Sequence, residues 1–225
     1  MDLYSYFQSR DQSQDATAVL PLEVKGAVRA DLPAYFAARG FTTGAEIGVW
    51  QGEHAERLCL GVPGLHLLCV DTWNDYPGYR ETERYKRRAT RTIPSLHGET
   101  GYGRPYAAAR ARLAPYDCQF IQALSVEAAA QIPDRSLDFV YIDGNHQFEY
   151  VVADLAAWTP KVKSGGVIAG HDYSHWGHSH VMQVVEAVEG WTRAYDIRPW
   201  FVLGRRRYRR GEPTERQRSF LWINP

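Results

Sequence analysis

The fold of this chain is decided by a stretch around residue 50, which reads Ala45-Glu46-Ile47-Gly48-Val49-Trp50-Gln51-Gly52. A short apolar run bounded by turn residues is typical of a buried strand. The glycines at its end let the backbone approach a ligand where the next helix begins. A helix-like stretch follows from His54 to Leu60. The segment therefore predicts a strand, a glycine turn and a helix in succession.

The rest of the chain repeats this alternation. Further strands are predicted at residues 65–70, 118–124, 137–142, 167–169, 197–203 and 219–223, and helices at residues 23–39, 81–90, 106–113, 126–132, 147–158 and 179–194. Alternating strands and helices imply right-handed crossovers and a largely parallel sheet that is covered on both faces. No helical pattern separates the last two strands, so we expect the sheet to end in an antiparallel hairpin.

Length and composition narrow the class of protein. The chain has 225 residues, with 26 basic and 26 acidic side chains. This neutral balance argues against a general nucleic-acid or membrane-surface binder, and no apolar run approaches the roughly 18 residues of a membrane span. The N-terminus lacks a signal-peptide pattern, and we interpret the three cysteines as reduced core residues, so we expect a cytoplasmic protein. We expect one domain over residues 41–225. Residues 1–40 form an N-terminal segment whose helix is expected to pack against that domain.

The candidate site consists of the polar residues at the ends of the predicted strands, because open α/β sheets bind ligands there. Gly48 and Gly52 lack the G-x-G-x-x-G series of dinucleotide-binding proteins. Asp71 ends the next predicted strand about 20 residues later, where a carboxylate can accept hydrogen bonds from ribose hydroxyls. The two signals in consecutive units favour a nucleoside-containing cofactor.

These motifs resemble class I S-adenosylmethionine-dependent methyltransferases. The stretch from Ala45 to Gly52 resembles their first motif, and Cys69-Val70-Asp71-Thr72-Trp73 resembles their ribose-binding acidic motif. The segments Phe139–His146 and Gly165–Tyr173 are similar to a bacterial branch that includes small-molecule and sugar O-methyltransferases, some of them metal-dependent. The resemblance implies a three-layer Rossmann-like methyltransferase fold, with a mainly parallel seven-stranded sheet and an antiparallel final strand.

The resemblance also assigns cofactor roles to matching positions. It places the first motif around the amino-acid part of S-adenosylmethionine, Asp71 on the ribose, and Asp143 near the transferred methyl group. The cofactor-binding residues that it implies are Glu46, Gly48, Val49, Gly52, Asp71, Thr72, Trp73, Ala123, Leu124, Ser125 and Asp143. Many relatives carry an acidic residue where this chain has Leu124, so the adenine contact differs here.

O-methylation requires that the acceptor be activated. A sugar-type hydroxyl is a very weak acid, so its in-line attack on a sulfonium needs a general base or a divalent cation. His146 is the candidate base, and with Asp143 and His171 it forms the expected catalytic set. Asp143, His171 and Asp172 form the expected metal set. Magnesium prefers oxygen ligands, and His171 stands where relatives carry a carboxylate, so magnesium, a transition metal and no metal all stay open.

The function expected is therefore methyl transfer to a hydroxyl of a small molecule, a sugar or a secondary metabolite. Three alternatives stay open: an iron-dependent hydroxylase using His146, His171 and Asp172, a noncatalytic nucleotide-binding module, and an RNA methyltransferase using the arginines of residues 205–218. Homo-oligomerisation is also left open. Residues 72–104 are a candidate lid over the site. A candidate histidine cluster includes His175, His178 and His180. A candidate aromatic rim consists of Trp50, Trp73, Tyr76, Tyr79 and Tyr102.

Overall fold

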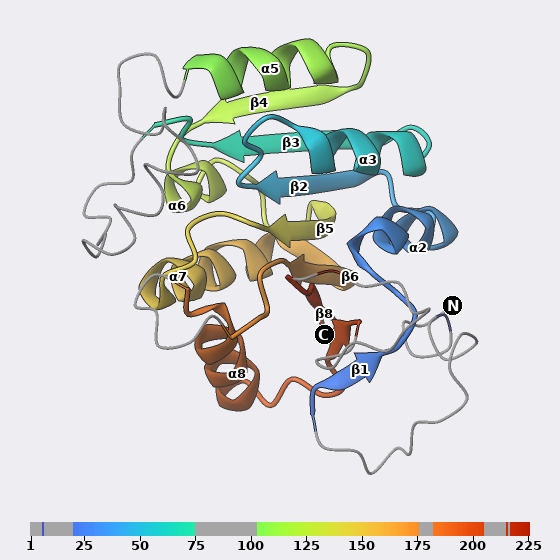
Figure 1. The fold of residues 1–225 in the computed structure, drawn as a ribbon, viewed down its shortest axis with the longest axis vertical. Helices are drawn as coiled ribbons and strands as arrows, with labels where there is room; N and C mark the ends of the chain where they lie inside the picture. Colours follow the sequence, from blue (N-terminus) through green and yellow to red (C-terminus); the bar gives the residue numbers. More distant parts are fainter. Residues whose placement is uncertain (1–5, 7–19, 75–102, 176–181, 205–214, 216) are drawn as a thin grey trace.

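The computed structural model describes residues 6, 20–74, 103–175, 182–204, 215 and 217–225, and the statements below concern these residues (Figure 1). Several sequence predictions lie outside them. These are the helix over 81–90, most of the expected lid, most of the arginine-rich segment, and the side chains of Tyr76, Tyr79, Tyr102, His178 and His180.

The described residues form a single eight-stranded sheet. Its strands are β1 (Leu22–Val24), β2 (Thr43–Ile47), β3 (His66–Asp71), β4 (Cys118–Gln122), β5 (Leu137–Ile142), β6 (Val162–Gly170), β7 (Phe201–Leu203) and β8 (Phe220–Ile223). They are ordered β1-β7-β8-β6-β5-β2-β3-β4. Every pairing is parallel except those of β8, which lies antiparallel between β6 and β7. The predicted antiparallel end of a mainly parallel sheet is confirmed.

The sheet has one strand more than the seven expected. The additional strand, β1, pairs in parallel with β7, with Leu22 opposite Phe201 and Val24 opposite Leu203. It occupies the start of the region predicted as a helix over residues 23–39. The helical part begins later, with the short 3₁₀ helix η1 (Arg29–Asp31) and α2 (Leu32–Ala38), whose second residue is Pro33. Proline fits the first helical turn, where its missing N–H costs no hydrogen bond.

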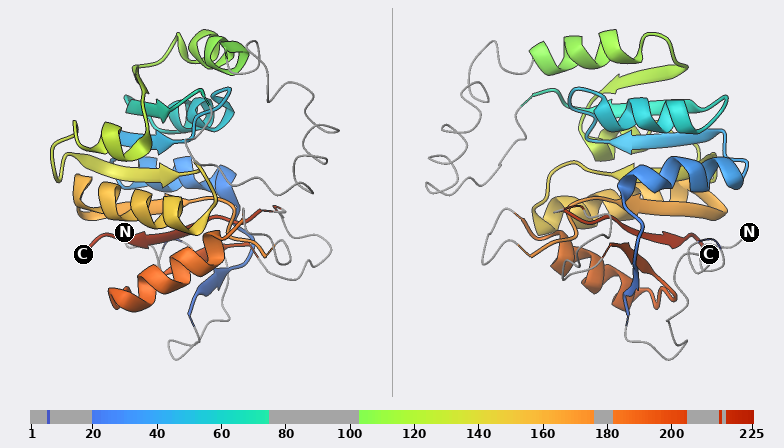
Figure 2. Two further views of the ribbon diagram at one scale, coloured as in Figure 1. Left: turned by 90° about the vertical axis from the view of Figure 1, so that its left-hand side faces the viewer. Right: turned by 45° about the vertical axis from the view of Figure 1, so that its right-hand side comes forward.

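Helices cover both faces of the sheet and give the predicted three layers (Figure 2). On one face lie α2, α3 (Glu53–Gly61) and α5 (Gly103–Leu113); on the other lie α6 (Ser125–Ala129), α7 (Phe148–Trp158) and α8 (Val184–Ala194). Alternation along β5 divides its side chains between the layers: Phe139 and Tyr141 enter the first core, and Val140 and Ile142 enter the second. The ring of Phe139 stacks on Phe36 of α2 at 4.3 Å between centroids.

The three cysteines of the chain come from separate elements but lie together. Cys59 on α3 and Cys118 on β4 place their sulfur atoms 3.6 Å apart, and the thiol of Cys69 on β3 also interacts with Cys118. All three are free thiols, and Cys69 is fully buried. They form part of the packing between α3 and the sheet.

The order of the strands fixes where a ligand can bind. From β2 the chain proceeds through β3 and β4 toward one edge of the sheet, whereas β5 and β6 lie on the other side of β2. The crevice between the carboxyl ends of β2 and β5 is thus a topological switch point, where α/β sheets of this kind bind their ligands. Among the helices that the structure describes, none combines the length and apolar character needed to cross a membrane.

Candidate active site

The loop after β2 lies directly against the loop after β5. The backbone N–H of Asp143 donates a hydrogen bond to the carbonyl oxygen of Ile47 at 2.7 Å. Gly48, next in the chain, has a φ of +91°, and a Cβ atom at this position would overlap the carbonyl oxygen of Asp143. Only glycine satisfies both the left-handed backbone and this close approach. Gly48 therefore allows the loops after β2 and β5 to make direct contact at the switch point.

Asp71, at the end of β3, is anchored to the same loop. One carboxylate oxygen accepts a hydrogen bond from the backbone N–H of Trp50 at 2.8 Å, and the other accepts one from the N–H of Trp73 at 2.8 Å. Burial raises the pKa of Asp71, and these backbone hydrogen bonds oppose the rise. The backbone groups of Val49 and Thr72 also favour the ionised carboxylate, which is the form that accepts hydrogen bonds from ribose hydroxyls.

Glu46, inside β2, forms a buried pair with His54 of α3. Oε1 of Glu46 lies 3.2 Å from Nδ1 of His54, and both residues are at most 6% exposed. Burial raises the pKa of Glu46 well above its usual value, and the charge of Asp143 raises it further. Burial and the positive charge of Arg29 lower the pKa of His54 to about 3. Burial therefore disfavours the charged form of both partners.

The second oxygen of Glu46 points to a missing ligand atom. Oε2 is buried and has no hydrogen-bond partner among the described residues. Leaving a buried acceptor unpaired costs about 1–3 kcal/mol, so such atoms generally meet a ligand or water. A polar cofactor group beside the glycine loop would satisfy this oxygen. The geometry therefore fits the amino-acid end of S-adenosylmethionine.

The side chains of Trp73 and Ser125, two of the expected cofactor-binding residues, make contacts within the protein. The ring of Trp73 is 3% exposed and packs against Tyr106 and Phe120, and its Nε1 donates to the carbonyl oxygen of Trp50 at 2.8 Å. The Trp73 side chain thus supports, from within the core, the loop after β2 that contains Trp50. The Ser125 hydroxyl accepts a hydrogen bond from the indole of Trp158 at 2.8 Å and holds α6 on α7.

The remaining residues expected at the adenine end lie around Asp71. The backbone N–H of Ala123 donates to the carbonyl oxygen of Asp71 at 3.2 Å, and the hydroxyl of Thr72 donates to the carbonyl oxygen of Asn74 at 2.8 Å. Leu124 follows Ala123 as the N-cap of α6 and is partly buried. Its aliphatic side chain offers no hydrogen-bond acceptor where relatives carry an acid. Any adenine contact of Leu124 is therefore apolar or made through its backbone.

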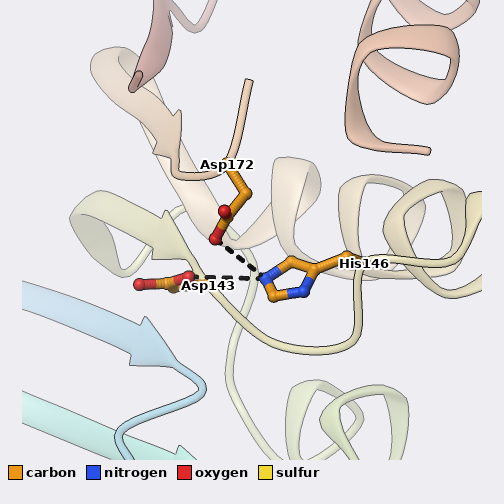
Figure 3. A group of neighbouring side chains, drawn as sticks. All are labelled: Asp143, His146 and Asp172. Atoms are coloured by element: carbon orange, nitrogen blue, oxygen red, sulfur yellow. Dashed lines mark ion pairs between the residues drawn. The ribbon is translucent and has the colours of Figure 1, made fainter. Parts of the chain in front are cut away.

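Asp143, His146 and Asp172 form a compact charged cluster across the ends of β5 and β6 (Figure 3). Nε2 of His146 lies 3.1 Å from Oδ2 of Asp172 and 3.7 Å from Oδ1 of Asp143. Burial alone would lower the pKa of His146, but the two carboxylates outweigh it and raise the pKa to about 10. The ring is therefore an imidazolium that bridges two carboxylates. In this state the expected base already holds a proton.

His171 lies beside this cluster. Its Nδ1 is 3.1 Å from Oδ2 of Asp172 and 3.7 Å from Oδ1 of Asp143. Burial opposes ionisation of Asp172, but His146 and His171 prevail and lower its pKa. His171 and the three residues of the cluster, all of them candidates named from the sequence, therefore lie together in the structure. His175, expected in the same histidine cluster, is exposed.

The residues fit a divalent cation. The atoms that Asp143, His146 and Asp172 would offer lie within 4.8 Å of one another. This set has His146 in the place where the sequence predicted His171. The imidazole of His146 sits on the loop between β5 and α7 and turns back toward both carboxylates, whereas His171 points its Nδ1 at its neighbour Asp172. One imidazole and two carboxylates suit manganese, iron or zinc better than magnesium.

Two residues of this site were missed at the sequence level. Nη1 of Arg29 donates to Oδ2 of Asp143 at 3.2 Å, and the backbone N–H of Arg29 donates to Oε2 of Glu215 at 2.8 Å. Arg29 lies 114 residues before Asp143, and Glu215 lies 186 residues after Arg29. Contacts at such separations leave no periodicity or spacing signal in a single sequence.

Comparisons with known proteins identify the family of this chain. A family model described as "Methyltransferase domain" matches residues 45–173, more than half of the chain. Comparison of the sequence with curated proteins gave no match.

Solved structures share the fold at low sequence identity. An O-methyltransferase from Bacillus cereus in complex with SAH is 15% identical with a TM-score of 0.56, over 87% of this chain and 80% of that chain. The O-methyltransferase NovP is 17% identical with a TM-score of 0.59, over 87% and 77%. An rRNA methylase from Streptococcus thermophilus is 10% identical with a TM-score of 0.55, over 92% and 99%. The chain belongs to the methyltransferase domain family and is an S-adenosylmethionine-dependent methyltransferase of class I.

Proposed function

We propose that this protein transfers the methyl group of S-adenosylmethionine to a hydroxyl group of a small molecule, a sugar or a secondary metabolite. The observation that carries the proposal is the cluster of Asp143, His146 and Asp172 beside the glycine loop. Charged groups at this point suit an acceptor that must lose a proton, as a hydroxyl must. The likeness to O-methyltransferases, NovP among them, supports the same chemistry.

The cofactor would lie across the ends of β2, β3 and β4. Its amino-acid end would meet Oε2 of Glu46 and the backbone at Gly48, Val49 and Gly52, and its ribose would meet Asp71. Thr72, Ala123 and Leu124 follow β3 and β4 at the adenine end. This arrangement would bring the methyl group near Asp143, because the loops after β2 and β5 are in contact.

The cluster would orient and deprotonate the acceptor. Asp143, His146 and Asp172 present two acceptors and one imidazolium, which can hold a hydroxyl in line with the sulfonium. His146 can take the acceptor proton only after the proton that it shares with the carboxylates has left. A divalent cation held by Asp143, His146 and Asp172 would lower the pKa of an acceptor hydroxyl.

The alternatives receive less support. Membership of a methyltransferase family argues against the iron-dependent hydroxylase and the noncatalytic module. RNA as the acceptor is disfavoured because basic and acidic side chains balance at 26 each. The likeness to an rRNA methylase concerns the fold alone. We therefore propose a small-molecule acceptor and a cytoplasmic location.

Calorimetry with S-adenosylmethionine and S-adenosylhomocysteine tests the cofactor site. We expect Asp71→Ala to weaken the binding of both at least tenfold, because each oxygen of Asp71 also anchors the cofactor loop. Asp134→Ala is the matched control, since Asp134 is exposed and pairs only with Lys161 among the contacts described for it. Unchanged affinity in Asp71→Ala would remove the ribose assignment.

The acceptor-activating role needs a separate test. Release of S-adenosylhomocysteine can be followed by mass spectrometry while the protein is offered panels of hydroxylated sugars and phenols. Once an acceptor is found, His146→Ala should lower turnover at least 100-fold while cofactor affinity stays within threefold. Near-normal turnover in that variant would reject His146 as the residue that activates the acceptor.

A further inference from the structure

A guanidinium reaches the catalytic cluster from outside the matched methyltransferase segment. Arg29 lies in η1, ahead of the segment that begins at residue 45. Its Nη1 is 3.2 Å from Oδ2 of Asp143, and the two side chains are 22% and 18% exposed. The ion pair is therefore mostly shielded from water, where charge–charge interactions are stronger than at a surface.

Arg29 is held in place from several directions. Glu215, which precedes β8, accepts a hydrogen bond from the backbone N–H of Arg29 at 2.8 Å and lies 3.8 Å from its Nε. Asp31 accepts from the backbone N–H of Val28 at 2.8 Å and fixes the turn that carries Arg29. The guanidinium is thus a built part of the site.

This contact divides the two oxygens of Asp143. Oδ2 is taken by Arg29, whereas Oδ1 faces Nε2 of His146 and Nδ1 of His171, each at 3.7 Å. A divalent cation bound by Asp143, His146 and Asp172 would therefore share one carboxylate with a fixed positive charge. The two cations repel each other across that carboxylate.

We propose that Arg29 is a positioning residue that supplies the permanent positive charge of this site. It orients and neutralises Asp143, and it thereby weakens the binding of divalent cations to the cluster. The inference rests on the proposed function, in which this cluster receives the acceptor. A merely structural Arg29 predicts the opposite effect, since loosening the site would lower its affinity for a cation.

Manganese binding tests the proposal without any knowledge of the acceptor. The affinity of Mn²⁺ would be measured by electron paramagnetic resonance on the full chain. Arg29→Gln and Arg29→Met both remove the charge, and we expect either to bind Mn²⁺ at least tenfold more tightly than the wild type. Arg29→Lys should stay within threefold of the wild type. Lys161→Gln, which removes a positive charge paired with Asp134 elsewhere on the surface, should not change the affinity.

The gain should depend on Asp143. Adding Asp143→Asn to Arg29→Gln should abolish the increase in Mn²⁺ affinity. Equal or weaker Mn²⁺ binding in the folded Arg29→Gln and Arg29→Met variants would overturn the proposal. Calorimetry with S-adenosylhomocysteine on the same proteins separates the two claims: failure of the wild type to bind it contradicts the proposed function, whereas the manganese comparison alone decides the role of Arg29.

Discussion

At the scale of the residue, Gly48 is the position at which the fold and the site depend on the same atom. Its φ of +91° and the close approach of the Asp143 carbonyl oxygen leave no room for a side chain. Gly48→Ala is expected to lower the free energy of unfolding by about 2 kcal/mol and to weaken S-adenosylhomocysteine binding at least tenfold. Denaturant unfolding and calorimetry measure the two effects.

Gly190 provides the control for that substitution. It lies inside α8, and a Cβ atom there would meet nothing within 4 Å. Gly190→Ala should raise stability by roughly 0.5–1 kcal/mol, because alanine is the better residue in the interior of a helix. If Gly190→Ala lowered stability and S-adenosylhomocysteine binding as much as Gly48→Ala, the close contact between the loops after β2 and β5 would not explain the effect of Gly48→Ala.

The sequence indicated which strand-end residues lie at the site, but it did not indicate which residues elsewhere in the chain contact them. Asp143, His146, His171 and Asp172 follow the apolar runs 139–142 and 167–169, so their convergence could be inferred from the expected strand ends. Arg29 could not be inferred in this way, because its contact with Asp143 joins positions that are 114 residues apart in the chain.

At the scale of the element, α6 and α7 are joined through a buried carboxyl group. Asp154 of α7 is 4% exposed, and burial raises its pKa to about 7, a rise that the Ser125 hydroxyl opposes by hydrogen bonding. The folded protein therefore binds this proton more tightly than the unfolded chain. The stability from Asp154 is complete below about pH 4 and is lost as the pH rises toward 7.

Asp154→Asn tests this linkage, because asparagine resembles the protonated acid at every pH. The stability of the variant relative to the wild type should rise between pH 4 and pH 8 by on the order of 3–4 kcal/mol. Urea unfolding at a series of pH values measures it. Asp134→Asn, a change at an exposed carboxylate, should show no comparable rise. A flat difference for Asp154→Asn would mean that the carboxyl group is ionised in the folded protein.

Elements differ in how well their boundaries could be predicted. Leu137–Ile142 is a strand with the predicted limits, because β5 is central in the sheet and apolar at every position except Asp138. β1 was missed because Leu22–Val24 has only three residues, which is too short for an alternating pattern to register. Its formation depends on pairing with β7, which lies about 180 residues away in the chain.

At the scale of the whole molecule, β1 in the N-terminal segment forms the edge of the sheet opposite β4. Arg218, just before β8, pairs with Glu23 of β1 at 2.7 Å, and its guanidinium lies 5.4 Å from the centre of the Tyr173 ring. The side chain of Arg218 is only 10% exposed. The pair therefore holds β1, and with it the turn that carries Arg29, against the rest of the sheet.

Arg218→Ala should release β1 from the sheet without unfolding the part of the sheet that contains β2 and β5. The variant is expected to lose about 1–3 kcal/mol of unfolding free energy, because the substitution removes the ion pair with Glu23 and the packing against Tyr173. Hydrogen exchange should quicken at Leu22–Val24 and stay unchanged in β2 and β5, and S-adenosylhomocysteine affinity should stay within threefold. Arg198→Ala is the control, since the Arg198–Asp196 pair is 70% and 80% exposed and such pairs contribute little. An equal loss of hydrogen-exchange protection in β1, β2 and β5 would instead show that these strands unfold as one cooperative unit.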